Sequence, residues 1–173
     1  VKPNLIVSDS RGAWFRATIL FILALIGTVG MWSVVVFIPD IEKEFGLDRG
    51  TSSLLYAFTM IGFGFGTVVI GKVYDKFGIK KPILLATFVL ITSYYFYSIF
   101  PFYWQFLILQ FFMGFAASAF FGPAMADISN FFNKQRGFAL SIVASANYVA
   151  GATWPLLIGC LLYTSPSPRD FQV

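Results

Sequence analysis

The chain alternates between long apolar stretches and short polar connections. Five stretches reach the length of about 20 mostly apolar residues that a membrane-spanning helix needs. They cover residues 13–38, 51–74, 82–100, 103–127 and 137–163. Their acidic and basic residues, Arg16, Lys72 and Asp127, all stand close to a boundary. Because a charge at the bilayer centre costs about 2.5–3.5 kcal/mol on insertion scales, such stretches insert readily. The pattern predicts an all-α membrane protein with five transmembrane helices.

Local signals predict where the first two helices end and begin. Pro39 and Asp40 follow the first stretch, and a proline removes a backbone donor and clashes with the preceding turn, so the first helix should end there. Thr51 or Ser52 should cap the second helix, since a hydroxyl can accept a hydrogen bond from the first free N–H groups.

Composition supports the membrane assignment and excludes most catalytic chemistry. The chain is 58% hydrophobic and 12% charged, with a mean hydropathy of +0.78, whereas soluble domains carry roughly 25% charged residues. It has no His and one Cys, Cys160, which disfavours zinc and haem sites and any Ser-His or Cys-His pair. We therefore expect no enzyme activity, no cofactor and no metal.

Basic residues divide unequally between the two sides of the predicted bundle. Nine Lys and Arg residues fall on one side: Lys2, Arg11, Arg16, Lys72, Lys76, Lys80, Lys81, Lys134 and Arg136. Two, Lys43 and Arg49, fall on the other, within an acidic connection. Because cytoplasmic loops carry the excess of Lys and Arg, we expect a multi-pass protein of the cell membrane, inner or plasma, with a cytoplasmic N-terminus. The net charge of +4 then reports topology rather than a nucleic-acid partner.

Three segments carry a resemblance to a known family. GKVYDKFGIKK covers Gly71–Lys81, FIPDIEKEFGLDRG covers Phe37–Gly50, and NFFNKQRGFALSI covers Asn130–Ile142. Their order and spacing resemble the major facilitator superfamily of transporters. Within it, the Trp32-Ser33 start and the Arg-Gly-Phe-Ala-Leu opening of the fifth stretch are most similar to bacterial relatives of monocarboxylate carriers.

The resemblance implies an architecture and a set of partners. Residues 1–159 are similar to the first five helices of the six-helix N-terminal bundle, so we expect a truncated bundle that lacks its sixth helix and its C-terminal half. Residues 160–173 form a polar tail, in which CLLYTSPSPRD resembles translated sequencing-adapter read-through, so we expect the tail to be non-native. The implied partners are a small-molecule substrate, the lipid bilayer and the missing half.

The resemblance also assigns a gating role to the loop after the second stretch. Its residues are Gly71, Asp75, Lys76, Gly78, Lys80 and Lys81. In the family the matching Asp is thought to join the two halves and close the cytoplasmic side. Asp75 should follow the end of the second helix and face the positive end of another helix, with Lys76 and Lys80 or Lys81 as partners. Alternatively, these lysines only fix the topology and meet anionic lipid. Ile79 departs from the family pattern, which has a basic residue there.

A second pair of charges is expected at the same side. Asp127 and Arg136 lie at the end of the fourth stretch and the start of the fifth. They predict either a surface pair, worth about 0–1 kcal/mol, or a latch that depends on the transport state.

Substrate contacts should come from polar residues at mid-membrane depth, where transporter sites lie. Asn147 is the first candidate, since a buried amide is costly unless it is bonded. The other candidates are Tyr148, Gln110, Thr28 and Trp32. For each of them, an interhelical hydrogen bond or core packing is the alternative interpretation.

The predicted function is secondary-active transport of a small organic solute, a carboxylate by the closer resemblance, through alternating access. Gln110 stands where many proton-coupled members carry Arg, and Gly151 with Pro155 matches the antiporter bend loosely, so proton antiport is not implied. Two alternatives stay open. One is a drug or metabolite exporter, and the other is a small structural or assembly protein of the membrane.

Overall fold

A computed structural model describes residues 9–99 and 102–164, apart from the side chain of residue 163. Within these ranges the chain forms six helices, and their bounds are α1 (Arg11–Gly27), α2 (Val29–Phe45), α3 (Arg49–Phe77), α4 (Lys80–Ile99), α5 (Tyr103–Phe131) and α6 (Arg136–Thr164). Because α1 and α2 together form one apolar span of 35 residues, the helices make five candidate membrane spans. The expected all-α membrane fold is confirmed.

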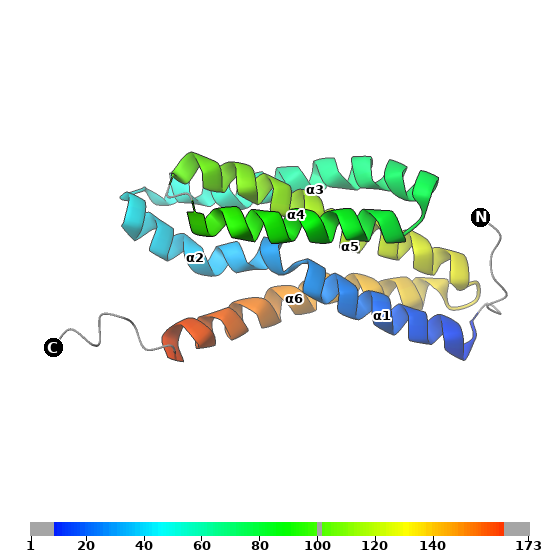
Figure 1. Ribbon diagram of the computed structural model, residues 1–173. Helices are drawn as coiled ribbons and strands as arrows, with labels where there is room; N and C mark the ends of the chain where they lie inside the picture. The colour runs from blue at the N-terminus through cyan, green and yellow to red at the C-terminus, as the bar shows by residue number, and fades with distance from the viewer. Residues whose placement is uncertain (1–8, 100–101, 165–173) are drawn as a thin grey trace.

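The helices run roughly parallel to one long axis and fall into two groups (Figure 1). Helices α3, α4 and α5 lie together, and α3 packs most extensively on α5. Helices α1 and α2 run end to end along the bundle, and α6 packs against both of them. Helix α5 also contacts α1, α2 and α6, so it joins the two groups.

Two glycines allow the close approach of α3 and α5. A Cβ atom on Gly62 would overlap the carbonyl oxygen of Phe111, and one on Gly114 would overlap the carbonyl oxygen of Thr59. Backbones can approach this closely only where small residues face each other, which is how membrane helices pack without a hydrophobic driving force. The Thr59 hydroxyl also donates to Gln110 Oε1 at 2.8 Å, so a polar bond joins the two helices beside the glycines.

The first helix does not end at Pro39, contrary to the sequence prediction. Helix α2 continues through Pro39 to Phe45. The proline removes one hydrogen bond in the middle of the helix, but the turn beyond it remains packed. Ile41 belongs to a buried cluster with Leu55, Tyr103 and Leu107. Burial of this turn outweighs the local cost of the proline.

The cap of α3 also differs from the prediction. Asp48, rather than Thr51 or Ser52, is the N-cap residue. Its carboxylate accepts hydrogen bonds from the N–H of Gly50 at 2.9 Å and of Thr51 at 3.2 Å, and from the Thr51 hydroxyl at 2.6 Å. These bonds hold the pKa of the Asp48 carboxyl below its usual value of 3.8, with the Thr51 hydroxyl as the largest cause. Thr51 therefore donates to the cap instead of providing it.

Candidate functional site

The first membrane span is broken at Thr28. Helix α1 ends at Gly27 and α2 begins at Val29, so Thr28 caps both, and the break is visible between the two ribbons (Figure 1). Thr28 is buried, and its hydroxyl donates to the carbonyl of Ala24 at 2.8 Å. Because Thr28 lies near the middle of the apolar stretch 13–38, we expect the break near mid-membrane depth.

Helix α6 binds both sides of this break through one of its faces. The Trp154 indole donates to the carbonyl of Leu25, which precedes the break in the sequence, at 2.8 Å. The Trp32 indole, which follows the break, donates to Asn147 Oδ1 at 3.2 Å. Between these bonds the Trp32 ring lies so close to Gly151 that a Cβ atom there would approach it to 2.9 Å. Asn147, Gly151 and Trp154 recur at helical spacing on one face, and we call these three residues with Trp32 the α6 clamp.

The structure brings together some of the predicted cavity residues and separates others. Asn147 and Trp32 are bonded, and Thr28 lies at the break next to them. Tyr148 follows Asn147 on α6 and is 76% exposed. Gln110 is buried and points to Thr59 of α3, away from the α6 clamp. The sequence analysis did not include Trp154, although its position seven residues after Asn147, with Gly151 between them, places all three on one helix face.

We expect Trp154→Phe to weaken the bundle by about 1 kcal/mol, because the part-buried carbonyl of Leu25 would lose its indole donor. Equilibrium unfolding in mixed detergent micelles measures this change. Trp104→Phe is the matched control, since Trp104 is 74% exposed and should change stability by less than about 0.5 kcal/mol. Equal stability of the two variants would show that the bond to Leu25 contributes nothing.

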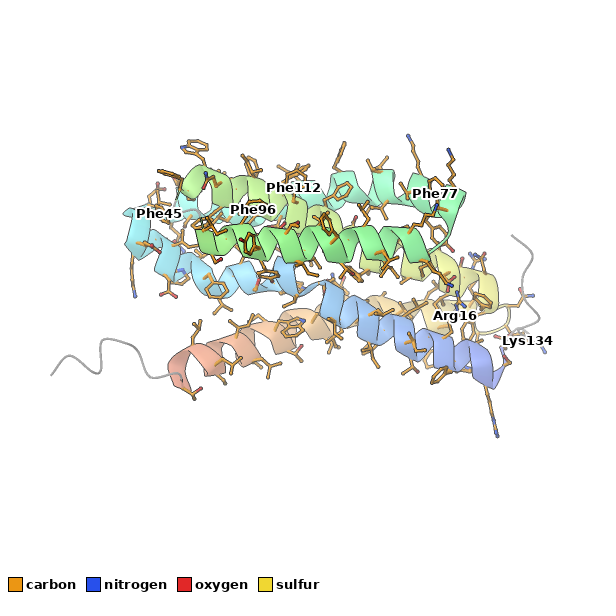
Figure 2. All side chains as sticks on the ribbon, in the orientation of Figure 1. Arg16, Phe45, Phe77, Phe96, Phe112 and Lys134 are labelled. Carbon is orange, nitrogen blue, oxygen red and sulfur yellow. The ribbon has the colours of Figure 1, made fainter. Side chains whose placement is uncertain are left out.

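One end of the bundle carries most of the basic residues, and we call it the basic end. It comprises the start of α1, the end of α3, the start of α4 and the α5–α6 connection. Figure 2 shows Arg16, Phe77 and Lys134 at this end, with Phe45 and Phe96 at the opposite one. Because successive spans run antiparallel, these four segments of the chain lie at the same end of the bundle.

At the basic end, Asp127 pairs with Arg16 and not with Arg136 as the sequence analysis proposed. Arg16 Nε lies 2.5 Å from Asp127 Oδ2, and Nη2 lies 2.9 Å from Oδ1, a bidentate geometry. The guanidinium also lies 4.4 Å from the ring centroid of Phe131. The side chain of Asp127 is 8% exposed and that of Arg16 is 36% exposed. A side chain this buried needs a partner from a packed helix, which α1 provides, whereas Arg136 is exposed at the start of α6.

Asp9 fixes the segment before α1 to the connection between α5 and α6. Its carboxylate accepts hydrogen bonds from the N–H of Lys134 at 3.1 Å and of Gln135 at 3.2 Å. These N–H groups directly precede α6, which begins at Arg136. The bonds, that of Lys134 first, hold the pKa of the Asp9 carboxyl below its ordinary value of 3.8.

The contact of Asp9 should therefore be present at neutral pH and be lost in acid. A carboxyl whose pKa is lowered by folding stabilises the folded contact above its unfolded pKa, and this stabilisation disappears as the pH falls through the lowered value. In nuclear magnetic resonance spectra, the amide shifts of Lys134 and Gln135 should titrate with a midpoint below 3.8. In Asp9→Ala the transition should be absent. A midpoint at or above 3.8 would contradict the contact.

The predicted gating loop differs from expectation in its local structure. Helix α3 continues to Phe77, so Asp75 lies in its last turn rather than after it, and Asp75 is exposed. No ion pair joins Asp75 to Lys76, Lys80 or Lys81 in the described residues. Instead, Lys81 Nζ lies 4.0 Å from the ring centroid of Phe77, a cation–π contact.

The two glycines of the loop differ in whether the backbone requires a glycine there. Gly78 ends α3 with a φ of 72°, a conformation that residues with a side chain rarely adopt. Gly71 has open space around its Cα, so no close approach requires a glycine there. Among the described residues, no group of three or more His, Cys, Asp or Glu could hold a metal ion.

A bundle of five apolar spans, with a broken helix and polar side chains at mid-membrane depth, defines a multi-pass membrane protein. A sequence model of the Major Facilitator Superfamily matches residues 20–169. The chain belongs to this superfamily, whose members are transporters rather than enzymes.

Individual relatives come from fungi and bacteria. The chain is 25% identical over 154 residues to the MFS-type transporter eupM of a Phoma species, covering 87% of this chain and 54% of that protein. It is 27% identical over 129 residues to the agnestins efflux protein AgnL12 of Paecilomyces divaricatus, covering 71% and 29%. It is 25% identical over 153 residues to the uncharacterized MFS-type transporter YdgK of Bacillus subtilis, covering 85% and 38%. The chain thus spans about half or less of the length of these relatives.

Proposed function

We propose that the complete protein is a secondary-active transporter of a small organic solute that works by alternating access. The observation that carries this proposal is the broken span at Thr28, held by the α6 clamp at mid-membrane depth. Discontinuous helices with free polar groups at this depth are typical of solute sites in transporters. Asn147 can still donate through its amide nitrogen, since only its oxygen receives the Trp32 indole.

The direction and the substrate class are separate questions. A carboxylate substrate was predicted from the closer resemblance to monocarboxylate carriers. At mid-depth, the described residues of the clamp provide an amide and two indoles, so the counter-charge of a carboxylate would have to come from residues beyond those described. Export is the second candidate, favoured by one relative that is named an efflux protein.

We place the basic end in the cytoplasm and the protein in the cell membrane, inner or plasma, because Lys and Arg concentrate at this end. Asp75 would then act in the inner gate, where a carboxylate in the last turn of α3 can approach the positive end of a helix in the other half. The exposure of Asp75 supports a partner outside the described residues.

Transport by the product of the complete reading frame, reconstituted in proteoliposomes, tests the proposal. Monocarboxylates, neutral aromatic solutes and organic cations would be offered on each side in turn, with and without a proton gradient. Accumulation of one class in one direction would establish transport and its polarity. No flux of any class, from a folded protein, would leave a structural or assembly role as the better account.

Asp75→Asn should slow transport about two- to fivefold, the rate equivalent of the 0.3–1 kcal/mol that a carboxylate typically gains at a helix N-terminus. Insertion into the membrane should be unchanged. Asp48→Asn is the matched control, because it removes one charge at the opposite end while asparagine can still cap α3. If Asp75→Asn transports at the wild-type rate, Asp75 is not part of the gate.

A further inference from the structure

Helix α2 has a second polar face, which points away from the α6 clamp. Ser33, Phe37, Asp40 and Glu44 recur at helical spacing and line a cavity of about 290 Å³. The other walls come from α4 and α5, so α1 and α6, which form the break and most of the clamp, do not line it. Trp32 and Ser33 are neighbours in the sequence, but Trp32 belongs to the α6 clamp and Ser33 lines the cavity. We call this cavity the side pocket.

The floor of the side pocket is polar, buried and already hydrogen-bonded. The hydroxyls of Ser33 and Tyr94 lie 3.3 Å apart, and Gln110 accepts from Thr59. Ser33 is 5% exposed and Gln110 is 3% exposed. These bonds hold the polar side chains of the floor in place.

The walls are aromatic and rigid. The rings of Tyr97 and Phe106 stack at a centroid distance of 4.7 Å with an interplanar angle of 6°, and the Tyr97 hydroxyl donates to the Phe106 carbonyl at 3.5 Å. Phe37 completes the aromatic lining. Such rings offer the apolar part of an aromatic ligand a surface on which to pack.

The rim is negatively charged and unpaired. Asp40 and Glu44 both line the pocket, and neither forms an ion pair within the described residues. Both lie towards the C-terminal end of α2, which ends at Phe45. The helix macrodipole is negative at this end, so carboxylates there are unfavourable for the helix itself. Two carboxylates and a helix C-terminus together favour a positive charge at the rim.

We propose that the side pocket binds a small aromatic organic cation, with its ammonium group between Asp40 and Glu44 and its apolar part against Tyr97 and Phe106. The inference is independent of the transport mechanism, because the pocket shares no α1 or α6 residue with the broken span. The charge pattern selects a solute rather than a phospholipid, since a phosphate group would be repelled by the two carboxylates.

Benzyltrimethylammonium is the probe, and neopentylbenzene is its neutral counterpart of the same shape. Equilibrium dialysis against nanodiscs that contain the product of the complete reading frame measures binding, with empty nanodiscs as the blank. We expect saturable binding of the cation, and binding of the neutral compound that is about tenfold weaker, as expected for the loss of two charge contacts.

Two double variants with the same change in charge locate the site. Asp40→Asn with Glu44→Gln should weaken cation binding about tenfold. Glu42→Gln with Asp48→Asn removes two neighbouring carboxylates outside the pocket, and it leaves an oxygen to accept from Ser52 and to cap α3. This control should bind as the wild type does. Equal losses in both double variants would indicate a general surface-charge effect and overturn the proposal.

A third variant tests the walls, and a change of lipid tests the occupant. Tyr97→Leu should weaken binding of the probe about two- to fivefold, because the phenyl ring of the probe would lose its aromatic partner, whereas Tyr148→Leu, at an exposed position on α6, should not. Saturable binding should persist in nanodiscs of both phosphatidylglycerol and phosphatidylethanolamine, and be weaker in the second, whose zwitterionic surface does not concentrate the cation. Binding that disappears in phosphatidylethanolamine would show that the lipid amine occupies the pocket, and absence of saturable binding in both lipids would rule out a cation site.

Discussion

Replacing Gly114 with alanine should destabilise the bundle by about 3 kcal/mol or more. The new methyl group would overlap the carbonyl oxygen of Thr59 on α3, and a backbone carbonyl cannot rotate aside as the end of a side chain can. Overpacking of a close contact typically costs about 1–3 kcal/mol and occasionally more, and here α3 and α5 would have to separate. Unfolding in mixed micelles, followed by helix content, measures the change.

Gly64→Ala is the control for this experiment. Gly64 lies on α3 between Gly62 and Gly66 but faces open space. Alanine there removes the helix penalty of glycine, about 0.5–1 kcal/mol, so stability should stay constant or rise. Equal destabilisation by Gly64→Ala and Gly114→Ala would mean that helix flexibility, rather than close packing of α3 on α5, requires these glycines.

Replacing Arg16 with methionine should cost about 1.5–3 kcal/mol, the range for a hydrogen bond to a charged group. The loss leaves the buried carboxylate of Asp127 without its bidentate partner. It should stay below the cost of breaking a fully buried pair, since the Arg16 side chain is 36% exposed and water screens it. Equilibrium unfolding at neutral pH is the measurement.

A double-mutant cycle with Asp127→Leu isolates the pair. The double variant should be more stable than the sum of the two single losses predicts, because no charge is then left unpaired. Arg136→Ala should change stability by less than about 0.5 kcal/mol. Additive losses for Arg16 and Asp127 would contradict the pair, and a large loss at Arg136 would indicate that Arg136 is the partner of Asp127, as the sequence predicted.

Apolar length and charge placement were sufficient to predict the fold class. Five uncharged interiors required five spans, and those spans are present. The ends of the helices were harder to predict, because local signals compete with packing. Pro39 should stop a helix, yet burial of Ile41 carries α2 past it. The break at Thr28 has no proline, but Gly27 and Gly30 flank it and weaken a helix there, a signal that the sequence analysis did not use.

The candidate site was only partly predictable, for a geometric reason. The pair of Trp32 with Asn147 could be anticipated as two polar groups in apolar stretches, but depth in the membrane does not determine direction around a helix. Gln110 has a suitable depth and still turns to Thr59 rather than to α6. Asp127 pairs with Arg16 on α1, 111 residues away in the chain, although Arg136 is closer in sequence.

The α6 clamp also constrains the order in which the protein can assemble. Its two indole bonds join residues 115 and 129 positions apart, so the first span to leave the ribosome is completed by the last described one. Until α6 is inserted, the carbonyl of Leu25 and the indole of Trp32 lack these partners, and the break is supported only by the contacts that α1 and α2 make with α3, α4 and α5. Because synthesis starts at the N-terminus, α3 and α5 can pack together before α6 is made. The break at Thr28 is fixed only when α6 packs against it.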